Sequence, residues 1–135
     1  MEPLIDYAWL DLVRGDGEAA RSAFQDCLAL ARHVGDRFNV AEALAGLSTQ
    51  AALDERHADA ARLAGASAEI HERIGAPPWE SLRAIHERAL QPARSVLGEE
   101  AFARLEAEGR RLPTDEALAR SRGAAAAEAT GRFAR

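Results

Sequence analysis

Apolar residues recur every three or four positions along most of this chain. That spacing places them on one face of an α-helix, so each sustained stretch predicts a helix. Glycine, proline and aspartate interrupt the stretches, as expected where one helix ends and another begins. The interruptions lie at residues 15–17, 35–36, 75–78, 98 and 109–113. Together these signals predict an all-α fold of six or seven helices.

Short turns between the predicted helices favour antiparallel hairpins. We therefore expect one helical domain over residues 1–122, with a flexible tail at 123–135 that is rich in alanine and has no apolar stripe. The domain would contain hairpins at about 3–35, 37–75 and 78–110, followed by a short helix at 114–122. Pro92 falls inside the fifth predicted helix and is expected to kink or divide it.

The pattern repeats once, with a period of about forty residues. A shift by that distance places Ala20 on Ala60, Cys27 on Ser67 and Gly35 on Gly75. This period is typical of two-helix units that bury their apolar faces by stacking on their neighbours. Such stacks present binding surfaces, and the repeat therefore favours recognition over chemistry.

Composition narrows the class of protein further. Apolar residues make up 47% of the 135 residues and aromatic residues only 5%, which favours closely packed helices over strands. No apolar run is long enough to span a bilayer. The single cysteine fits a reducing cytoplasm, and the net charge of −5 argues against direct binding of nucleic acid. We expect a cytoplasmic protein that contacts neither membrane nor nucleic acid.

Candidate catalytic and metal-binding groups do not converge in the sequence. The four histidines (residues 33, 57, 71 and 86) include no pair at the helical spacing of two metal ligands, and we interpret them as surface or helix-end residues. Glu99 and Glu100 point about 100° apart on a helix, so they cannot act on one substrate atom. Cys27 lies among apolar residues and is expected to be a packing residue. We predict no catalytic residue, no metal site and no cofactor.

A candidate groove or interface involves the first and third predicted helices. Its residues are Ile5, Trp9, Leu12, Val13, Glu42 and Thr49. Tryptophan is a common interface anchor, and Trp9 either lies in this groove or packs inside its own hairpin. The first helix also carries apolar residues with no polar cap beyond them, which indicates self-association as a further use of the same surface.

The spacing within the repeat resembles that of a tetratricopeptide repeat. In the first unit, the matching positions are Gly15-Asp16, Ala20, Phe24, Cys27 and Leu28. The second unit matches more loosely at Ala60, Ala64, Ser67 and Ala68, with Glu55 in place of the turn glycine. The resemblance implies a short α-solenoid whose concave face binds extended peptides.

The C-terminal half resembles the end of the helical-repeat region in LuxR-type bacterial transcriptional regulators and related signal-transduction ATPases. The segments that carry this resemblance are Ile74-Gly75-Ala76-Pro77, Ala93-Arg94, residues 97–102, Glu108-Gly109-Arg110, Leu112-Pro113 and Asp115-Glu116-Ala117. In that family an ATPase module precedes the repeats and a helix-turn-helix often follows them. The chain contains no lysine, and therefore no standard phosphate-binding loop.

These observations favour a non-catalytic protein–protein interaction or scaffold module of a bacterial signalling or transcriptional regulator, with a protein or peptide as partner. The first alternative is a helical domain that senses a small molecule. The second is a remnant of a larger LuxR-type regulator without its ATPase and DNA-binding parts. A groove with open ends would favour a peptide, whereas a pocket with converging buried polar groups would favour a small ligand.

Overall fold

The computed structural model describes residues 2–119, and this part of the chain is helical throughout with short turns. The helices are α1 (Glu2–Val13), α2 (Gly17–Val34), α3 (Arg37–Leu53), α4 (His57–Ile74), α5 (Glu80–Leu97) and α6 (Glu99–Arg111). A further helical segment covers residues 114–119. The prediction of an all-α fold is thus confirmed. The end of the short helix predicted at 114–122 and the tail predicted at 123–135 lie outside the described residues.

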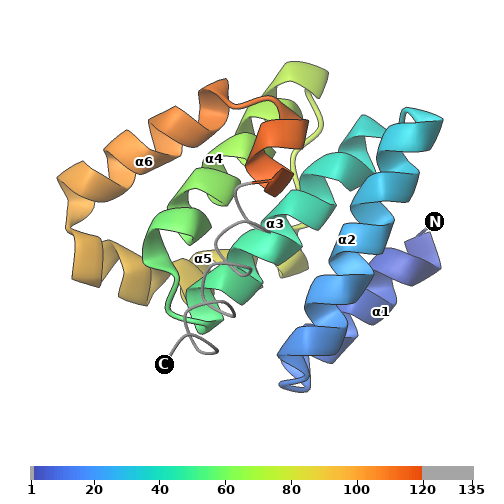
Figure 1. Ribbon diagram of the computed structural model, residues 1–135, viewed down its shortest axis with the longest axis horizontal. Coiled ribbons are helices and arrows are strands. Elements are labelled where there is room, and N and C mark those ends of the chain that lie inside the picture. Colours follow the sequence, from blue (N-terminus) through green and yellow to red (C-terminus); the bar gives the residue numbers. More distant parts are fainter. Residues whose placement is uncertain (1, 120–135) are drawn as a thin grey trace, which may run out of the picture.

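The helices follow one another across the molecule, from α1 and α2 at one side to α6 at the other (Figure 1). Helix α3 lies in the middle and packs against α1, α2, α4 and α5. Every residue from 39 to 52 is buried, including several polar ones. Because α3 is covered on all sides, its polar side chains depend on partners inside the protein.

The forty-residue period is visible in the backbone. Helix α2 spans Gly17–Val34 and α4 spans His57–Ile74, so both ends are displaced by forty positions. The turns before these two helices also match. The N–H of Gly15 donates to the carbonyl oxygen of Leu12 at 3.1 Å, and the N–H of Glu55 donates to that of Ala52 at 3.1 Å. Both donors have a positive φ, 85° at Gly15 and 62° at Glu55.

Helices α5 and α6 do not pair along their length in the way that α3 and α4 do. They meet around Gly98 and then diverge, so that α6 packs along α4 while α5 crosses α3 and α4 (Figure 1). Two glycines bring α6 and α4 into backbone contact. A Cβ atom on Gly65 would lie 2.0 Å from the carbonyl oxygen of Glu106, and one on Gly109 would lie 1.9 Å from that of Arg62.

Helix α5 runs without a break from Glu80 to Leu97, with Pro92 inside it. The prediction that Pro92 divides this helix is therefore wrong. Proline removes one backbone donor and leaves the carbonyl four residues earlier without its helical partner. Arg88 and Pro92 are both exposed, so water can solvate that carbonyl and the helix continues.

Aromatic side chains contribute to the core between α1, α2 and α3. The rings of Trp9 and Phe24 meet edge to face, with 5.3 Å between their centroids. Cys27 is fully buried beside them in the core, and burial raises the pKa of its thiol. At the other end of the described chain, Asp115 forms an ion pair with Arg32 and fastens segment 114–119 to α2. None of the helices described between residues 2 and 119 has the length and apolar character needed to cross a membrane.

Candidate functional site

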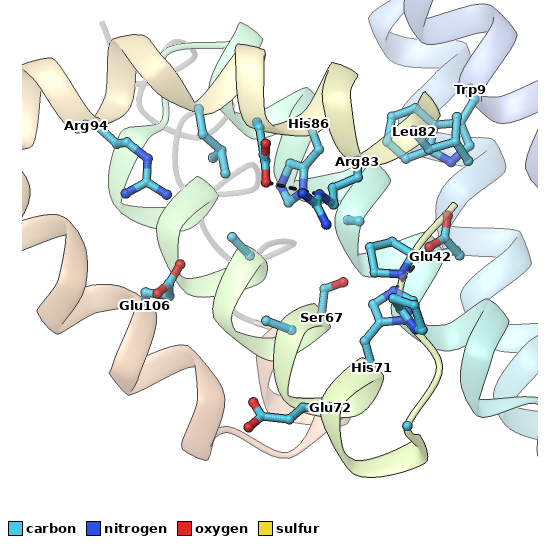
Figure 2. A pocket seen from close by; sticks show the side chains of 18 residues that line it. Trp9, Glu42, Ser67, His71, Glu72, Leu82, Arg83, His86, Arg94 and Glu106 are labelled. Atoms are coloured by element: carbon cyan, nitrogen blue, oxygen red, sulfur yellow. Dashed lines mark ion pairs between the residues drawn. The ribbon is translucent and has the colours of Figure 1, made fainter. Parts of the chain in front are cut away.

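The divergence of α5 from α6 leaves a cleft of about 470 Å³ over α4. Every helix except α2 contributes to its walls, together with the linker between α4 and α5 (Figure 2). The lining residues are Trp9, Glu42, Ala45, Ala64, Ser67, Ala68, His71, Glu72, Gly75, Pro77, Pro78, Leu82, Arg83, His86, Glu87, Leu90, Arg94 and Glu106.

Small and apolar side chains give the cleft its depth. Helix α4 presents Ala64 and Ala68, which occupy little volume, and α5 faces them with Leu82 and Leu90. Because α5 is held away from α4 by its route to Gly98, these short side chains do not fill the space between the two helices. The result is an apolar wall long enough for the body of a small ligand.

Glu42 is a buried carboxylate at the inner wall of this cleft. Its side chain comes from the central helix α3 and is only 1% exposed. One of its oxygens, Oε1, lies 3.1 Å from Nε2 of His71. Neither oxygen accepts a hydrogen bond of good geometry from any other described residue. The carboxylate is therefore contacted by one imidazole nitrogen and keeps most of its capacity to accept hydrogen bonds.

His71 links Glu42 to the linker before α5. Its Nδ1 lies 2.8 Å from the carbonyl oxygen of Ala76. A carbonyl only accepts, so Nδ1 carries the hydrogen of this bond. Nε2 then faces the Glu42 carboxylate, 3.1 Å from Oε1. The pair thus connects the buried carboxylate to residues that form the rim of the cleft.

His86 enters the cleft from α5 and is held by a relay of hydrogen bonds. The hydroxyl of Ser48 donates to the carbonyl oxygen of Ala60 at 2.7 Å. That hydroxyl must therefore accept from Nε2 of His86, which lies 2.8 Å away. Burial, reinforced by the positive charge of Arg94 and by His71, lowers the pKa of His86 to about 4. The ring is neutral at pH 7.

The arginines of the cleft already have partners. Arg83 pairs with Glu87 on the same helix at 3.4 Å. Arg94 lies 3.6 Å from a carboxylate oxygen of Glu99, and its guanidinium sits 4.1 Å above the centre of the Phe102 ring. The positive charges of Arg83 and Arg94 are thus paired with carboxylates near the mouth of the cleft, whereas the buried carboxylate of Glu42 lies at its inner wall.

This arrangement can hold a ligand by apolar contact, by charge and by hydrogen bonds. Across residues 2–119 there is no group of three or more histidine, cysteine, aspartate or glutamate side chains placed to hold a metal ion.

The residues predicted for a groove are distributed over three environments. Trp9 and Glu42 both line the cleft. Ile5, Leu12 and Thr49 are buried elsewhere, and the Thr49 hydroxyl donates to the carbonyl oxygen of Ala45 at 2.8 Å. Val13 is exposed on α1, outside the cleft. Both interpretations of Trp9 apply. It is 3% exposed and packs on Phe24 inside its own hairpin, and it also forms part of the cleft wall.

His71 and His86 were not expected in a site. His71 lies in the last turn of α4, as the interpretation of the histidines as surface or helix-end residues allows, but it is buried and not at the surface. A local signal for it exists, because Ala64, Ser67 and His71 share one face of α4 at spacings of three and four. His86 has no such signal, since its partner Ser48 lies 38 positions earlier.

Comparisons of the chain with protein-family models, with curated proteins and with solved structures gave no match.

Proposed function

We propose that this chain is a non-catalytic recognition module that binds a small molecule in the cleft over α4. The observation that carries this proposal is the combination of an apolar wall with the buried side chains of Glu42 and His71 and the partly buried His86 in one cleft of about 470 Å³. Clefts that bind small molecules commonly measure about 300–1,000 Å³ and carry a few placed polar groups in an apolar lining.

The sequence favours one class of protein for such a module. The resemblance of the C-terminal half to LuxR-type regulators favours a cytoplasmic sensor in a bacterial signalling or transcriptional protein. The net charge of −5 supports recognition of something other than nucleic acid by this chain.

A second candidate function is protein–protein recognition through the outer face of α1. This helix buries Ile5, Ala8, Trp9 and Leu12 in the core, yet its remaining surface carries further apolar side chains. The exposed ones are Leu4, Tyr7, Leu10 and Val13. Asp6 and Asp11 interrupt this face, but its large exposed apolar side chains support a protein partner or a second copy of the chain there.

A screen of metabolite-sized compounds by thermal shift, followed by titration of each hit, tests the proposal. The variant Ala68→Leu places a larger side chain on the cleft wall and should weaken every genuine hit at least tenfold. The matched control is Ala29→Leu, the same change at an exposed position of α2 outside the cleft. Hits that bind Ala68→Leu as tightly as the unaltered chain would show that the cleft is not the binding site.

A further inference from the structure

The buried carboxylate of Glu42 indicates what kind of ligand the cleft selects. A carboxylate can accept about four hydrogen bonds, and leaving a buried one short of partners is costly. Glu42 has the His71 contact at 3.1 Å and no hydrogen bond to either oxygen from the rest of the described chain. The carboxylate oxygens therefore lack hydrogen-bond donors, and a positively charged donor forms the strongest hydrogen bond with them.

The carboxylate can reach a ligand in the cleft. Glu42 lines the cleft, and Figure 2 shows it beside His71 at the end of the cleft to which Trp9 and Leu82 also belong. Its two oxygens are covered by neighbouring atoms. The terminal torsion of a glutamate has a broad minimum, so the carboxylate can turn about that bond at little cost, and a ligand at Glu42 requires such a turn to uncover an oxygen.

The other charges around the cleft also favour a cation. Its lining contains four glutamates (residues 42, 72, 87 and 106) and two arginines (residues 83 and 94), a formal balance of −2 if the histidines are neutral. His86 is neutral at pH 7 because burial depresses its pKa, so it does not repel a cation. Both arginines are paired, with Glu87 and Glu99, and are not available to hold an anion alone.

The rest of the wall requires an apolar body on the same ligand. Leu82, Leu90 and the two prolines of the linker lie along the cleft, and Trp9 closes the end near Glu42. The indole Nε1 of Trp9 is buried and donates to no described residue, so it is available to an acceptor atom. A simple inorganic cation would leave the apolar surface unused.

Building on the proposed function, we infer that the cleft recognises a protonated amine carried on an apolar or aromatic body, with the ammonium group at Glu42. The ammonium donates to the carboxylate, and the apolar body lies between Ala68 of α4 and Leu82 and Leu90 of α5. An anionic ligand of the same shape would place a second negative charge beside the Glu42 carboxylate and is disfavoured.

Three probes of similar shape and different charge test this inference: phenethylamine, 2-phenylethanol and 3-phenylpropionate. Binding is followed at pH 7 through the indole N–H signal of Trp9 in two-dimensional NMR spectra, assigned with the variant Trp79→Phe. We expect the amine to bind the unaltered chain at least ten times more tightly than the alcohol, and the propionate to bind more weakly still. Equal binding of the amine and the alcohol would overturn the inference.

Two variants test whether Glu42 causes the preference for the amine over the alcohol. Glu42→Gln should reduce the ratio between amine and alcohol to about one, whereas Glu72→Gln, which removes an exposed glutamate from the same cleft, should preserve it. Preservation of the ratio in Glu42→Gln would overturn the assignment. If Glu42→Gln does not fold, the comparison of amine and alcohol in the unaltered chain decides alone.

Failure of the inference and failure of the proposed function give different results. If the alcohol or the propionate binds as well as the amine, and Ala68→Leu abolishes that binding, the cleft binds ligands but does not select amines. If none of the three probes moves the Trp9 signal, the inference fails, and the compound screen separately decides the proposed function. A capped hexapeptide with one lysine, bound with the same dependence on Glu42, would support the amine chemistry and assign its source to a peptide.

Discussion

His86 shows how burial of a single side chain couples the cleft to pH. In the folded chain its pKa is lowered to about 4 from the ordinary value of 6.5. Between these two values the unfolded chain takes up a proton at this histidine and the folded chain does not. The free energy of unfolding is therefore greatest above pH 6.5 and falls as the pH drops towards 4.

We expect His86→Gln to remove this part of the pH dependence. The difference between 6.5 and about 4 corresponds to about 3 kcal/mol of unfolding free energy lost across that interval in the unaltered chain. Glutamine keeps a donor for Ser48 but does not titrate, so the variant should show a flatter profile. Urea unfolding followed by circular dichroism at several pH values measures both profiles.

The matched control is His33→Gln, which removes a histidine from an exposed position of α2. It should retain the slope of the unaltered chain between pH 4 and 6.5. An unchanged slope in His86→Gln would show that this histidine does not carry the effect.

At the same scale, the sequence predicts only part of the site. Trp9 and Glu42 could be selected because the repeat places them on the first and third helices, which together face a groove. His71 could not be paired with Glu42 in advance, because the two lie 29 positions apart and meet only once α3 and α4 have packed. His86 depends on a further step, the path of α5 across α3.

Among the elements, the contact of α4 with α6 sets the geometry of the cleft. Gly65 and Gly109 allow the two backbones to touch, which draws α6 along α4 and away from α5. The helices themselves and their approximate ends follow from local periodicity and from the glycine turns. The divergence of α5 and α6 does not, because it rests on the close approach of α4 and α6 at Gly65 and Gly109, two glycines 44 positions apart.

We expect Gly109→Ala to destabilise the fold and to disturb the cleft. An added Cβ would lie 1.9 Å from the carbonyl oxygen of Arg62, and backbone atoms cannot move aside cheaply. Overpacking of this kind outweighs the gain in helix propensity from glycine to alanine, so the free energy of unfolding should fall by about 2 kcal/mol. Urea unfolding measures the change.

Gly17→Ala is the control for this substitution. The added Cβ would meet the end of the Gln50 side chain, with Nε2 at 2.5 Å, and this side chain must shift at the expense of its hydrogen bond to Asp54. The free energy of unfolding should fall by at most about 1 kcal/mol, half of the loss expected for Gly109→Ala. A loss as large as that of Gly109→Ala would show that the α4–α6 contact has no special role.

In the turn between α3 and α4, a substitution by glycine is expected to increase the free energy of unfolding. Glu55 occupies the position that Gly15 occupies in the turn between α1 and α2, and it does so with a φ of 62°. Side chains disfavour this left-handed region, whereas glycine adopts it freely. We expect Glu55→Gly to raise the free energy of unfolding by about 0.5–1 kcal/mol, measured by urea unfolding.

The control is Glu18→Gly, which also replaces a glutamate by glycine. Glu18 is exposed in the first turn of α2, where the backbone is helical. Here glycine should lower stability, by about 0.5–1 kcal/mol. Destabilisation by Glu55→Gly as well would contradict the account of this turn.

At the scale of the whole molecule, the two ends of the described chain differ. Segment 114–119 folds back on the body, with Ala117 and Leu118 buried and Asp115 paired with Arg32. Helix α1, by contrast, covers the core with one face and leaves Leu4, Tyr7, Leu10 and Val13 exposed on the others. This surface is separate from the exposed part of the cleft that α5 and the linker form.

We expect the chain to form a weak dimer through α1. One helical face buries less than the roughly 800 Å² per partner of a stable complex, so dimers should appear only at high micromolar concentration. Tyr7→Glu should keep the chain monomeric in sedimentation velocity experiments up to about 500 μM, because it places a charge in the apolar contact. Val96→Glu is the matched control, since Tyr7 and Val96 are similarly exposed (65% and 67%) and Val96 lies on α5. An interface on α1 would be contradicted if the unaltered chain stayed monomeric over this range, or if both variants dissociated the dimer equally. Dissociation by Tyr7→Glu alone would place the interface on α1. The cleft would then remain free to bind its ligand within the dimer.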